Sequence, residues 1–372
     1  MNRICLILLV SLTAVAQLCA GDMQPTTLPL GSPAPDFNLP GVGGHEHALK
    51  EFAAAKLLVV VFTCNHCPTA QYYEERFKQL ASDYKGRGVA VVGIMPNDPK
   101  SVRLDELGWT DLGDSLEEMK IRARDCQYNF PYLYDGDTEA VARAYGPVAT
   151  PHVFAFDPAR KLRYVGAIDD SERVQHVTKH YLRDALDALL ADQEPALTKT
   201  KVVGCSIKWA GKAESVDAYM QKLANEPVAL IPADADGLTA LRKNSSGKIR
   251  LVNFWATWCA PCVAEFHELV TINRMYRHRD FEVVTVSVNR PDEEKNVLKF
   301  LKQQQASCTN MIFASADREK LINAVDPDWQ GPVPYTLLIA PDGKLLYQET
   351  GSIDPLALKR TILKALNERK PW

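Results

Sequence analysis

The chain has 372 residues, of which 46% are hydrophobic, and a formal net charge of −3. This is an ordinary globular composition, and the length is sufficient for two hydrophobic cores. A net charge near zero gives no reason to expect a nucleic-acid partner. Nine cysteines make thiol chemistry the first function class to consider.

The N-terminal residues 1–20 differ from the rest of the chain and predict a signal peptide. Arg3 is their only charged residue, and residues 4–16 are almost wholly apolar. Residues 4–20 are also just long enough to span a membrane, so a retained N-terminal anchor is the alternative. We therefore expect an extracytoplasmic protein, in the periplasm or the cell envelope, where disulfides form and exchange.

The first unit follows a Pro- and Thr-rich linker at residues 21–35 and alternates strands with helices. Residues 96–118 are polar and turn-rich, which predicts an insertion. We expect strands at 56–62, 89–95, 130–134, 152–156 and 162–167, and helices from Cys67 and at 119–123, 140–145 and 172–190.

The second unit repeats this order. We expect its strands at 249–254, 281–288, 311–314 and 336–340, and its helices from Cys259 and at 293–304 and 355–366. Strands alternating with helices, then a hairpin and a last helix, match the thioredoxin-fold order. The sequence thus predicts an α/β protein with two tandem thioredoxin-fold domains, each a central mixed β-sheet flanked by helices. Their expected bounds are 31–190 and 228–370, joined by a linker at 191–227 that contains the sequence GCSIKW.

A strand-to-helix turn in the second unit carries the sequence Trp-Cys-Ala-Pro-Cys, with Cys259 and Cys262 three residues apart. This spacing is typical of a redox dithiol. At a helix N-terminus the free N–H groups and the helix dipole stabilise a thiolate, so Cys259 can attack a disulfide and Cys262 can resolve the product. A static disulfide or a zinc pair is the alternative, but no second pair at zinc-ligand spacing is visible in this unit.

The repeat fixes the roles of the first dithiol, Cys64 and Cys67. Placing Cys67 on Cys259 aligns the two units without a gap from the strand through the turn and helix to the next strand. The aligned pairs include Lys56 with Lys248, Phe62 with Phe254, Tyr84 with Tyr276 and Asn97 with Asn289. Cys67 is therefore the expected helix-entry nucleophile and Cys64 the resolving thiol, with a static Cys64–Cys67 bridge as the alternative.

Two neighbours of Cys67 support this assignment. Pro68 suits the first position of a helix. His66 directly precedes the nucleophile and can lower the pKa of Cys67 when the imidazole is protonated. The alternative for His66 is an exposed loop histidine without a role.

The sequence Cys-Asn-His-Cys-Pro, with a Gly-x-x-Ala-Pro-Asp-Phe opening from Gly31, resembles the peroxiredoxin-like (AhpC/TSA-type redoxin) branch of the thioredoxin-like superfamily. The resemblance covers about residues 31–210 and includes the GCSIKW tail, which recurs in that group. Peroxidases of that family carry a threonine where this chain has Cys64.

The second domain resembles the TlpA/ResA-type thiol–disulfide oxidoreductases over about residues 228–370, through the sequence Trp-Ala-Thr-Trp-Cys-Ala-Pro-Cys. In that family a glutamate three residues after the second cysteine tunes the dithiol, and Glu265 stands at that position. A carboxylate there can accept a proton during resolution; a solvated helix charge is the alternative. Asn253 stands where thioredoxin itself carries an aspartate.

Pro151 and Pro334 stand where the thioredoxin fold places its cis-proline, and ordinary trans turn prolines are the alternative. The residue before such a proline offers its backbone to a substrate chain. We therefore assign substrate contacts to Thr150 and Val333, and also to Trp258 and His66 beside the nucleophiles.

Three further cysteines lie outside the dithiols. Cys126 and Cys308 are expected to be simply buried. Cys205 lies between the domains, where it either relays a disulfide between Cys67 and Cys259 or is an unpaired structural thiol.

The sequence therefore predicts an exported thiol–disulfide oxidoreductase without cofactor or metal, with a part in redox homeostasis. Its expected partners are protein dithiols or disulfides and an upstream thiol reductant or oxidant, and electrons are expected to pass between the domains. One alternative is a thiol peroxidase, an antioxidant enzyme using Cys67. Another is a copper-binding or copper-chaperone module using Cys64, His66 and Cys67, with His45 or His47 as further soft ligands.

Overall fold

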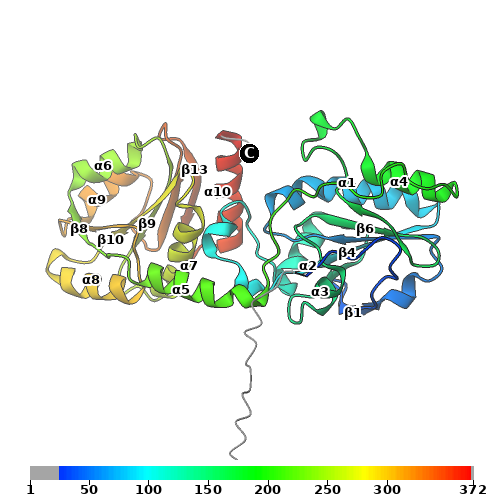
Figure 1. Cartoon of the computed structure of the whole chain (residues 1–372). Helices are drawn as coiled ribbons and strands as arrows, with labels where there is room; N and C mark the ends of the chain where they lie inside the picture. Colours follow the sequence, from blue (N-terminus) through cyan, green and yellow to red (C-terminus); the bar gives the residue numbers. More distant parts are fainter. Residues whose placement is uncertain (1–24, 370–372) are drawn as a thin grey trace, which may run out of the picture.

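The computed structural model describes residues 25–369 and shows two sheet-containing domains side by side (Figure 1). The predicted signal peptide, or anchor, at residues 1–20 lies outside the described residues. Between residues 25 and 369, no helix is both long enough and apolar enough to cross a bilayer.

The first domain is built on a five-stranded mixed sheet with the order β5-β4-β3-β6-β7. The central strand β3 (Leu57–Phe62) runs parallel to β4 (Val89–Met95), which is parallel to β5 (Tyr132–Tyr134). On the other side β6 (His152–Phe156) and β7 (Leu162–Gly166) are antiparallel. Every residue of β3 is buried, as expected for a strand covered on both faces.

Helices cover both faces of this sheet. The side chains of α1 (Pro68–Lys85) and α4 (Tyr181–Leu190) pack against one face, and α3 (Ala140–Tyr145) packs against the other, together with Ile207 and Trp209 from the GCSIKW tail. The tail therefore belongs to the core of the first domain. The remaining elements are α2 (Leu116–Asp125), a hairpin of β1 (Asn38–Pro40) and β2 (Glu46–Ala48), and the 3-10 turn η1 (Leu49–Phe52) that follows it.

The helix predicted at 172–190 is wrong in its first half, because α4 begins only at Tyr181. Residues 169–180 form a loop with one 3-10 turn, η4 (Val174–His176). The carboxylate of Asp170 accepts hydrogen bonds from the backbone and side chain of Thr178. Side-chain bonds of this kind, together with β-branched residues, favour a loop over a helix.

The second domain contains a six-stranded mixed sheet with the order β13-β12-β9-β10-β11-β8. Its strands are β8 (Ile231–Ala233), β9 (Ile249–Trp255), β10 (Phe281–Ser287), β11 (Thr309–Phe313), β12 (Tyr335–Ile339) and β13 (Leu345–Thr350). The strand β9 takes the place of β3, with a parallel neighbour on one side and an antiparallel neighbour on the other. The two tandem mixed sheets flanked by helices confirm the predicted fold class.

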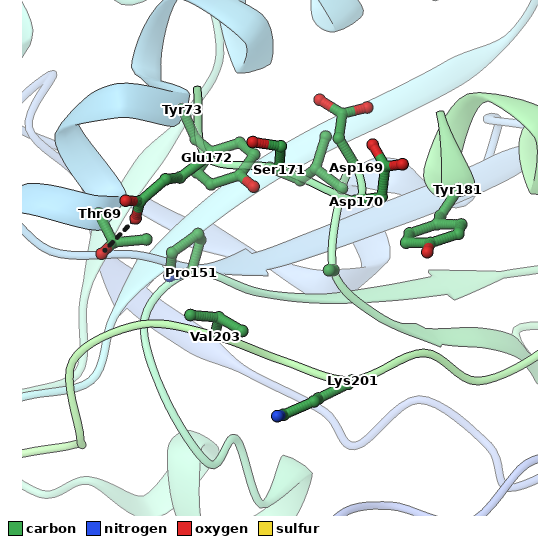
Figure 2. Close-up of a pocket in the computed structure, with 12 residues that line it drawn as sticks. Thr69, Tyr73, Pro151, Asp169, Asp170, Ser171, Glu172, Tyr181, Lys201 and Val203 are labelled. Carbon is green, nitrogen blue, oxygen red and sulfur yellow. Dashed lines mark hydrogen bonds between the residues drawn. The ribbon is translucent and has the colours of Figure 1, made fainter. Parts of the chain in front are cut away.

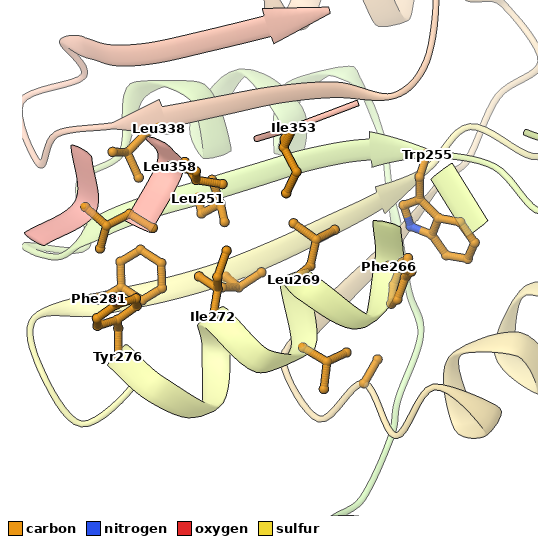
Figure 3. Close-up of a cluster of buried hydrophobic side chains, with 14 of the residues drawn as sticks. Leu251, Trp255, Phe266, Leu269, Ile272, Tyr276, Phe281, Leu338, Ile353 and Leu358 are labelled. Carbon is orange, nitrogen blue, oxygen red and sulfur yellow. The ribbon is translucent and has the colours of Figure 1, made fainter. Parts of the chain in front are cut away.

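Five helices cover this sheet. The helices α7 (Ala260–Tyr276), α8 (Glu294–Gln303) and α10 (Pro355–Arg369) pack on one face, around the cluster of Leu251, Trp255, Phe266, Leu269 and Leu358 (Figure 3). The helices α6 (Ala235–Lys243) and α9 (Arg318–Val325) pack on the other. Strand β8 and helices α6 and α9 were not predicted, because they are short and lack a long hydrophobic period.

The domains are joined by α5 (Ala213–Ala224), which follows the short turn η5 (Ala210–Lys212), and by the predicted insertion at 96–118 (Figure 1). The insertion leaves the first domain, forms the turns η2 (Pro99–Ser101) and η3 (Leu104–Leu107), and packs against the second domain. Leu104 and Leu107 contact the core cluster around α7.

Specific contacts fix the end of this segment. The Tyr276 hydroxyl donates a hydrogen bond of 2.8 Å to the carbonyl of Thr110. The guanidinium of Arg279 lies 3.9 Å from the ring centroid of Trp109. On α10, Arg360 forms an ion pair of 2.8 Å with Asp111. The insertion is therefore an ordered bridge between the domains.

Candidate functional site

Both dithiols lie at the same place in their domains, where the central strand passes into the first long helix. Cys67 is the N-cap of α1, and its sulfur accepts a hydrogen bond from the N–H of Ala70. Cys259 is the N-cap of α7, and its sulfur lies 3.3 Å from the N–H nitrogen of Cys262. Cys67 is therefore the helix-entry cysteine of the first domain, as the alignment of the repeat predicts.

The second dithiol forms a disulfide between Cys259 and Cys262, with an S–S distance of 2.04 Å. The sulfur of Cys259 lies 3.5 Å from the carbonyl oxygen of Val333. The Val333–Pro334 peptide bond is cis, as predicted. Trp258 precedes the disulfide with 57% of its surface exposed, and it lines a cavity of about 350 Å³. The role of these residues in binding a substrate stays a prediction.

Glu265 is buried against the central strand and is not a solvated helix charge. Its carboxylate accepts a hydrogen bond of 3.0 Å from the N–H of Ile353 and lies 3.5 Å from the amide nitrogen of Asn253. Burial raises the pKa of Glu265, against the smaller effect of these hydrogen bonds. The buried carboxyl of this domain therefore comes from α7, while β9 supplies a neutral amide.

The first dithiol consists of two buried free thiols, with Cys64 2% and Cys67 0% exposed. The sulfur of Cys64 lies 3.1 Å from the Thr150 hydroxyl, and that of Cys67 lies 3.2 Å from the Thr150 carbonyl oxygen. The Thr150–Pro151 peptide bond is cis, as predicted. Both thiols therefore meet the same loop.

The two thiols differ in acidity. Burial raises the pKa of Cys67, but hydrogen bonds from the thiols of Cys205 and Cys64 and from the Ala70 N–H, together with the charge of His66, outweigh it. The pKa of Cys67 is left well below its ordinary value. Burial, and the hydrogen bond to Cys67, raise the pKa of Cys64 well above its ordinary value. Cys67 is therefore the more acidic of the two thiols and the better nucleophile.

His66 is buried and paired with Asp114, a residue that the sequence analysis missed. The His66 Nδ1 lies 2.5 Å from one carboxylate oxygen of Asp114. Burial lowers the pKa of His66, but the charge and hydrogen bond of Asp114 outweigh burial and raise it. A raised pKa favours an imidazolium beside Cys67, which is the electrostatic role predicted for His66. The predicted contact between His66 and a substrate stays a prediction.

Both carboxylate oxygens of Asp114 have hydrogen-bond partners. Its other oxygen accepts hydrogen bonds from the backbone N–H groups of Asn65 (2.9 Å) and His66 (3.1 Å), and Asn97 donates to the first at 2.7 Å. Asp114 lies in the bridging segment 96–118, far from the dithiol in sequence. Its only local signal is the capping box that begins at Ser115, which marks a helix start and not an active-site residue.

Cys205 lies beside the first dithiol. Its backbone pairs with that of Thr150: the N–H of Thr150 donates to the carbonyl of Cys205 at 2.9 Å, and the N–H of Cys205 donates back at 3.2 Å. Its side chain packs against the cluster that contains Cys64 and Cys67. A Cβ at Gly204 would lie 2.0 Å from the Thr150 carbonyl oxygen, so this close approach requires glycine.

The remaining cysteines lie apart from the dithiols. Cys126 ends α2, and both Cys126 and Cys308 are half-buried, so the prediction that they are simply buried is wrong. Burial raises the pKa of Cys308 to about 12. Neither forms a disulfide.

The donors considered for copper are only partly brought together. Within residues 25–369, the one group of three or more ligand atoms is that of Cys64, His66 and Asp114, which lie within 4.8 Å of one another. The imidazole and carboxylate of this group are already bonded to each other, and His45 and His47 are not part of it. The geometry therefore favours the electrostatic role of His66.

A pocket of about 400 Å³ opens beside the cis-proline of the first domain (Figure 2). Pro151 and Val203 form part of its wall, and the Thr69 hydroxyl donates a hydrogen bond to Glu172 at one end of the pocket. Lys201 lines the opposite side. The pocket thus lies along the segment that leads to Cys205.

Comparisons with known proteins show the family of the chain. The model of the AhpC/TSA family matches residues 30–165 and 227–348, together more than half of the chain. Thiol-disulfide oxidoreductase ResA of Geobacillus thermodenitrificans is 30% identical over 140 residues, which cover 37% of this chain and 73% of that protein. The ResA protein of Halalkalibacterium halodurans is 26% identical over 137 residues, with the same coverage of both chains.

Solved structures are similar over about half of the chain. A hypothetical protein of Sinorhizobium meliloti is 36% identical, covering 50% of this chain and 98% of its own, with a TM-score of 0.45. An uncharacterised conserved protein of Geobacillus kaustophilus is 38% identical, covering 49% and 92%, with a TM-score of 0.44.

Replacing Asp114 by asparagine should raise the pKa of Cys67. The carboxylate holds the charge on His66, and that charge favours the Cys67 thiolate. The pH midpoint of Cys67 alkylation by iodoacetamide should therefore move upward in D114N. Asp111→Asn, on the same segment but without a contact to His66, is the matched control. An unchanged midpoint in a folded D114N protein would contradict the role of the His66–Asp114 pair.

Replacing Glu265 by glutamine should slow resolution by Cys262, because the variant loses the carboxyl that exchanges the proton. A loss of about 10²-fold is expected for general acid–base catalysis. Since the pKa of Glu265 is raised, the wild-type rate should rise with pH through a midpoint above the ordinary carboxyl range, and E265Q should lose this step. Rapid-mixing measurements across pH test this, with Glu268→Gln on the same helix as control. If E265Q keeps this rise of the rate with pH, the titrating group is not Glu265.

Proposed function

Because the chain belongs to the AhpC/TSA family, we propose that it is an exported enzyme that exchanges disulfides with protein dithiols through Cys259 and Cys262 and through Cys64 and Cys67. The thioredoxin-like redoxin superfamily predicted from the sequence is confirmed by the family match and the ResA relatives. The predicted signal peptide at residues 1–20 supports export.

One observation carries the proposal: in each domain a cysteine caps a helix and faces the residue before a cis-proline, with a second cysteine three residues away. The cap stabilises the thiolate, and in the second domain the loop at Val333 offers a backbone edge to a substrate. Cys67 and Cys259 are therefore the nucleophiles of this proposal.

The reduction of a substrate disulfide by the second domain takes two steps. The thiolate of Cys259 attacks one substrate sulfur, the substrate S–S bond breaks, and the other substrate sulfur leaves as a thiolate. Cys262 gives up its proton, with Glu265 as the acceptor, and attacks Cys259. The Cys259–Cys262 disulfide forms, and the second substrate sulfur leaves and is protonated. The substrate gains two electrons, and the dithiol loses them.

The first domain runs the same exchange with a different electrostatic arrangement. Its nucleophile is stabilised by an imidazolium and two thiols, and that of the second domain by the helix terminus, with a buried carboxyl nearby. Dithiols in different electrostatic surroundings differ in reduction potential. We therefore include in the proposal a transfer of electrons between the two dithiols, with Cys205 as intermediate thiol.

The thiol peroxidase remains the second candidate function, because the pKa of Cys67 is lowered as a peroxidatic cysteine requires. Against it, the Cys67 sulfur that peroxide would have to reach is fully buried, in one cluster with Cys64 and Cys205. Oxidation of Cys67 by hydrogen peroxide faster than that of free cysteine would favour this candidate.

Trapping tests the exchange at the second domain. Cys262→Ser should accumulate mixed disulfides through Cys259 when the full chain is expressed in its native envelope, because the resolving thiol is missing. Cys259→Ser should accumulate none at this site. Non-reducing gels and mass spectrometry identify what is attached. Adducts of glutathione alone in C262S would contradict dedicated protein clients.

The electron transfer between domains makes a separate prediction. Cys259→Ser should slow the oxidation of the reduced Cys64–Cys67 dithiol by an external disulfide by about 10-fold or more, a change of about 1.4 kcal/mol in the barrier. Cys308→Ser, in the same domain but outside the dithiol, is the control. Alkylation of quenched samples measures the rate. If C259S and C67S each leave the other dithiol at its full rate, the domains work independently.

A further inference from the structure

Cys205 pairs with Thr150 and packs against the cluster of the first dithiol, although it lies in a segment that connects two domains. We propose that Cys205 is a third redox thiol of the first domain, which receives the disulfide from Cys64 and presents it to external thiols. This inference rests on the proposed exchange at Cys64 and Cys67.

The first support is the position of Cys205 on the loop before the cis-proline. Its backbone forms a two-way antiparallel bridge with Thr150, whose side chain and carbonyl also contact Cys64 and Cys67. Cys205 packs against the same cluster as the dithiol. Three sulfurs thus gather around one residue, and the glycine at position 204 permits the close approach.

The second support is the occupied substrate edge. Thr150 offers the backbone edge on which a client chain would pair, and in this domain the chain's own segment at Cys205 already fills it. In the second domain, no backbone bridge forms at Val333 among the residues that the structure places. A client strand can therefore pair beside Cys259, while beside Cys67 the strand is internal and carries its own cysteine.

The third support is access. Cys64 and Cys67 are buried, whereas Cys205 is partly exposed. Val203 and Val148, each two residues from a member of the bridge, are 62% and 54% exposed. The pocket beside Pro151 runs along the same segment. An external thiol therefore meets Cys205 before it meets the dithiol.

The exchange needs no added oxidant. The thiolate of Cys205 attacks the sulfur of Cys67 in the oxidised domain, a Cys67–Cys205 bond forms, and the Cys64–Cys67 bond breaks. The electron pair leaves on Cys64, which takes up the proton that Cys205 released. The Thr150 hydroxyl, 3.1 Å from Cys64, can donate a hydrogen bond to this leaving sulfur.

An external protein dithiol then completes the cycle. One of its thiolates attacks Cys205, and Cys67 leaves as a thiolate, which its lowered pKa favours. The second external thiol attacks the mixed disulfide and releases Cys205. The client is oxidised by two electrons and the first domain is reduced by two.

The acidity of Cys205 fits this order of events. In the reduced domain its hydrogen bond to Cys67 is the largest cause that raises the pKa of Cys205, followed by burial. This cause disappears when Cys67 is part of a disulfide. Cys205 therefore becomes more acidic in the state in which it has to attack.

Disulfide mapping tests the bond itself. The full chain with Cys64→Ser, oxidised with diamide and digested with trypsin without reduction, should yield the peptide 57–76 linked to the peptide 202–208. The double variant C64S/C205S should not yield this link. Absence of the link in C64S, although Cys67 is oxidised by diamide, would overturn the proposal.

Kinetics test the role. Cys205→Ser and Cys205→Ala should both slow the reduction of the Cys64–Cys67 disulfide by dithiothreitol by about 10-fold or more, whereas Cys126→Ser should match the wild type. Circular dichroism confirms that the variants are folded. Equal rates in the Cys205 and Cys126 variants would overturn the role of Cys205 alone. A wild-type chain that never cycles between the Cys64–Cys67 dithiol and disulfide would instead overturn the proposed function.

Discussion

The first domain depends on one buried carboxylate, that of Asp114. An unpaired buried charge is costly, and this one is stabilised by the His66 imidazolium, the Asn97 amide and two backbone N–H groups. The same bonds hold the loop that carries the dithiol and keep a positive charge beside Cys67. Because Asp114 belongs to the segment 96–118, whose Thr110 and Asp111 are bound by the second domain, the contact between domains and the electrostatics of Cys67 share one short stretch of chain.

The repeat shows what this carboxylate replaces. The alignment that places Cys67 on Cys259 also places Asn65 on Thr257 and Asn97 on Asn289. In the second domain, the N–H of Thr257 donates to the Asn289 side chain directly. In the first domain, Asp114 stands between the corresponding residues: it accepts from the N–H of Asn65 and from the side chain of Asn97. The second domain thus holds its loop with a neutral amide and the first domain with a carboxylate. The carboxylate also gives the neighbouring His66 a counterion.

Sequence patterns predicted the features that depend on local order. Most strands of both sheets and both helix-capping cysteines follow from buried strands, turn residues and the repeat. Both cis-prolines follow from the resemblance to the thioredoxin fold. The helix start at 172 was wrong because Asp170 binds the backbone of a loop, a local competition that periodicity does not register. Asp114 was missed for a different reason. Its partners are 17 to 49 residues away, and nothing in a polar, turn-rich segment shows which carboxylate will be buried.

The residues that distinguish the two dithiols lie on a helix in the second domain and on connecting segments in the first. In the second domain Glu265 lies on α7 itself, the helix that Cys259 caps. In the first domain the specialised groups lie on the bridging segment 96–118 and on the tail with Cys205, and these two segments contact each other. Asn97 accepts a hydrogen bond from the N–H of Lys208, and the Lys208 ammonium pairs with Glu106. Because Asn97 also donates to Asp114, the support of His66 and the placement of the Cys205 tail are parts of one network. A substitution in the tail that displaces Lys208 should therefore also alter the hydrogen bonds that support the His66 imidazole.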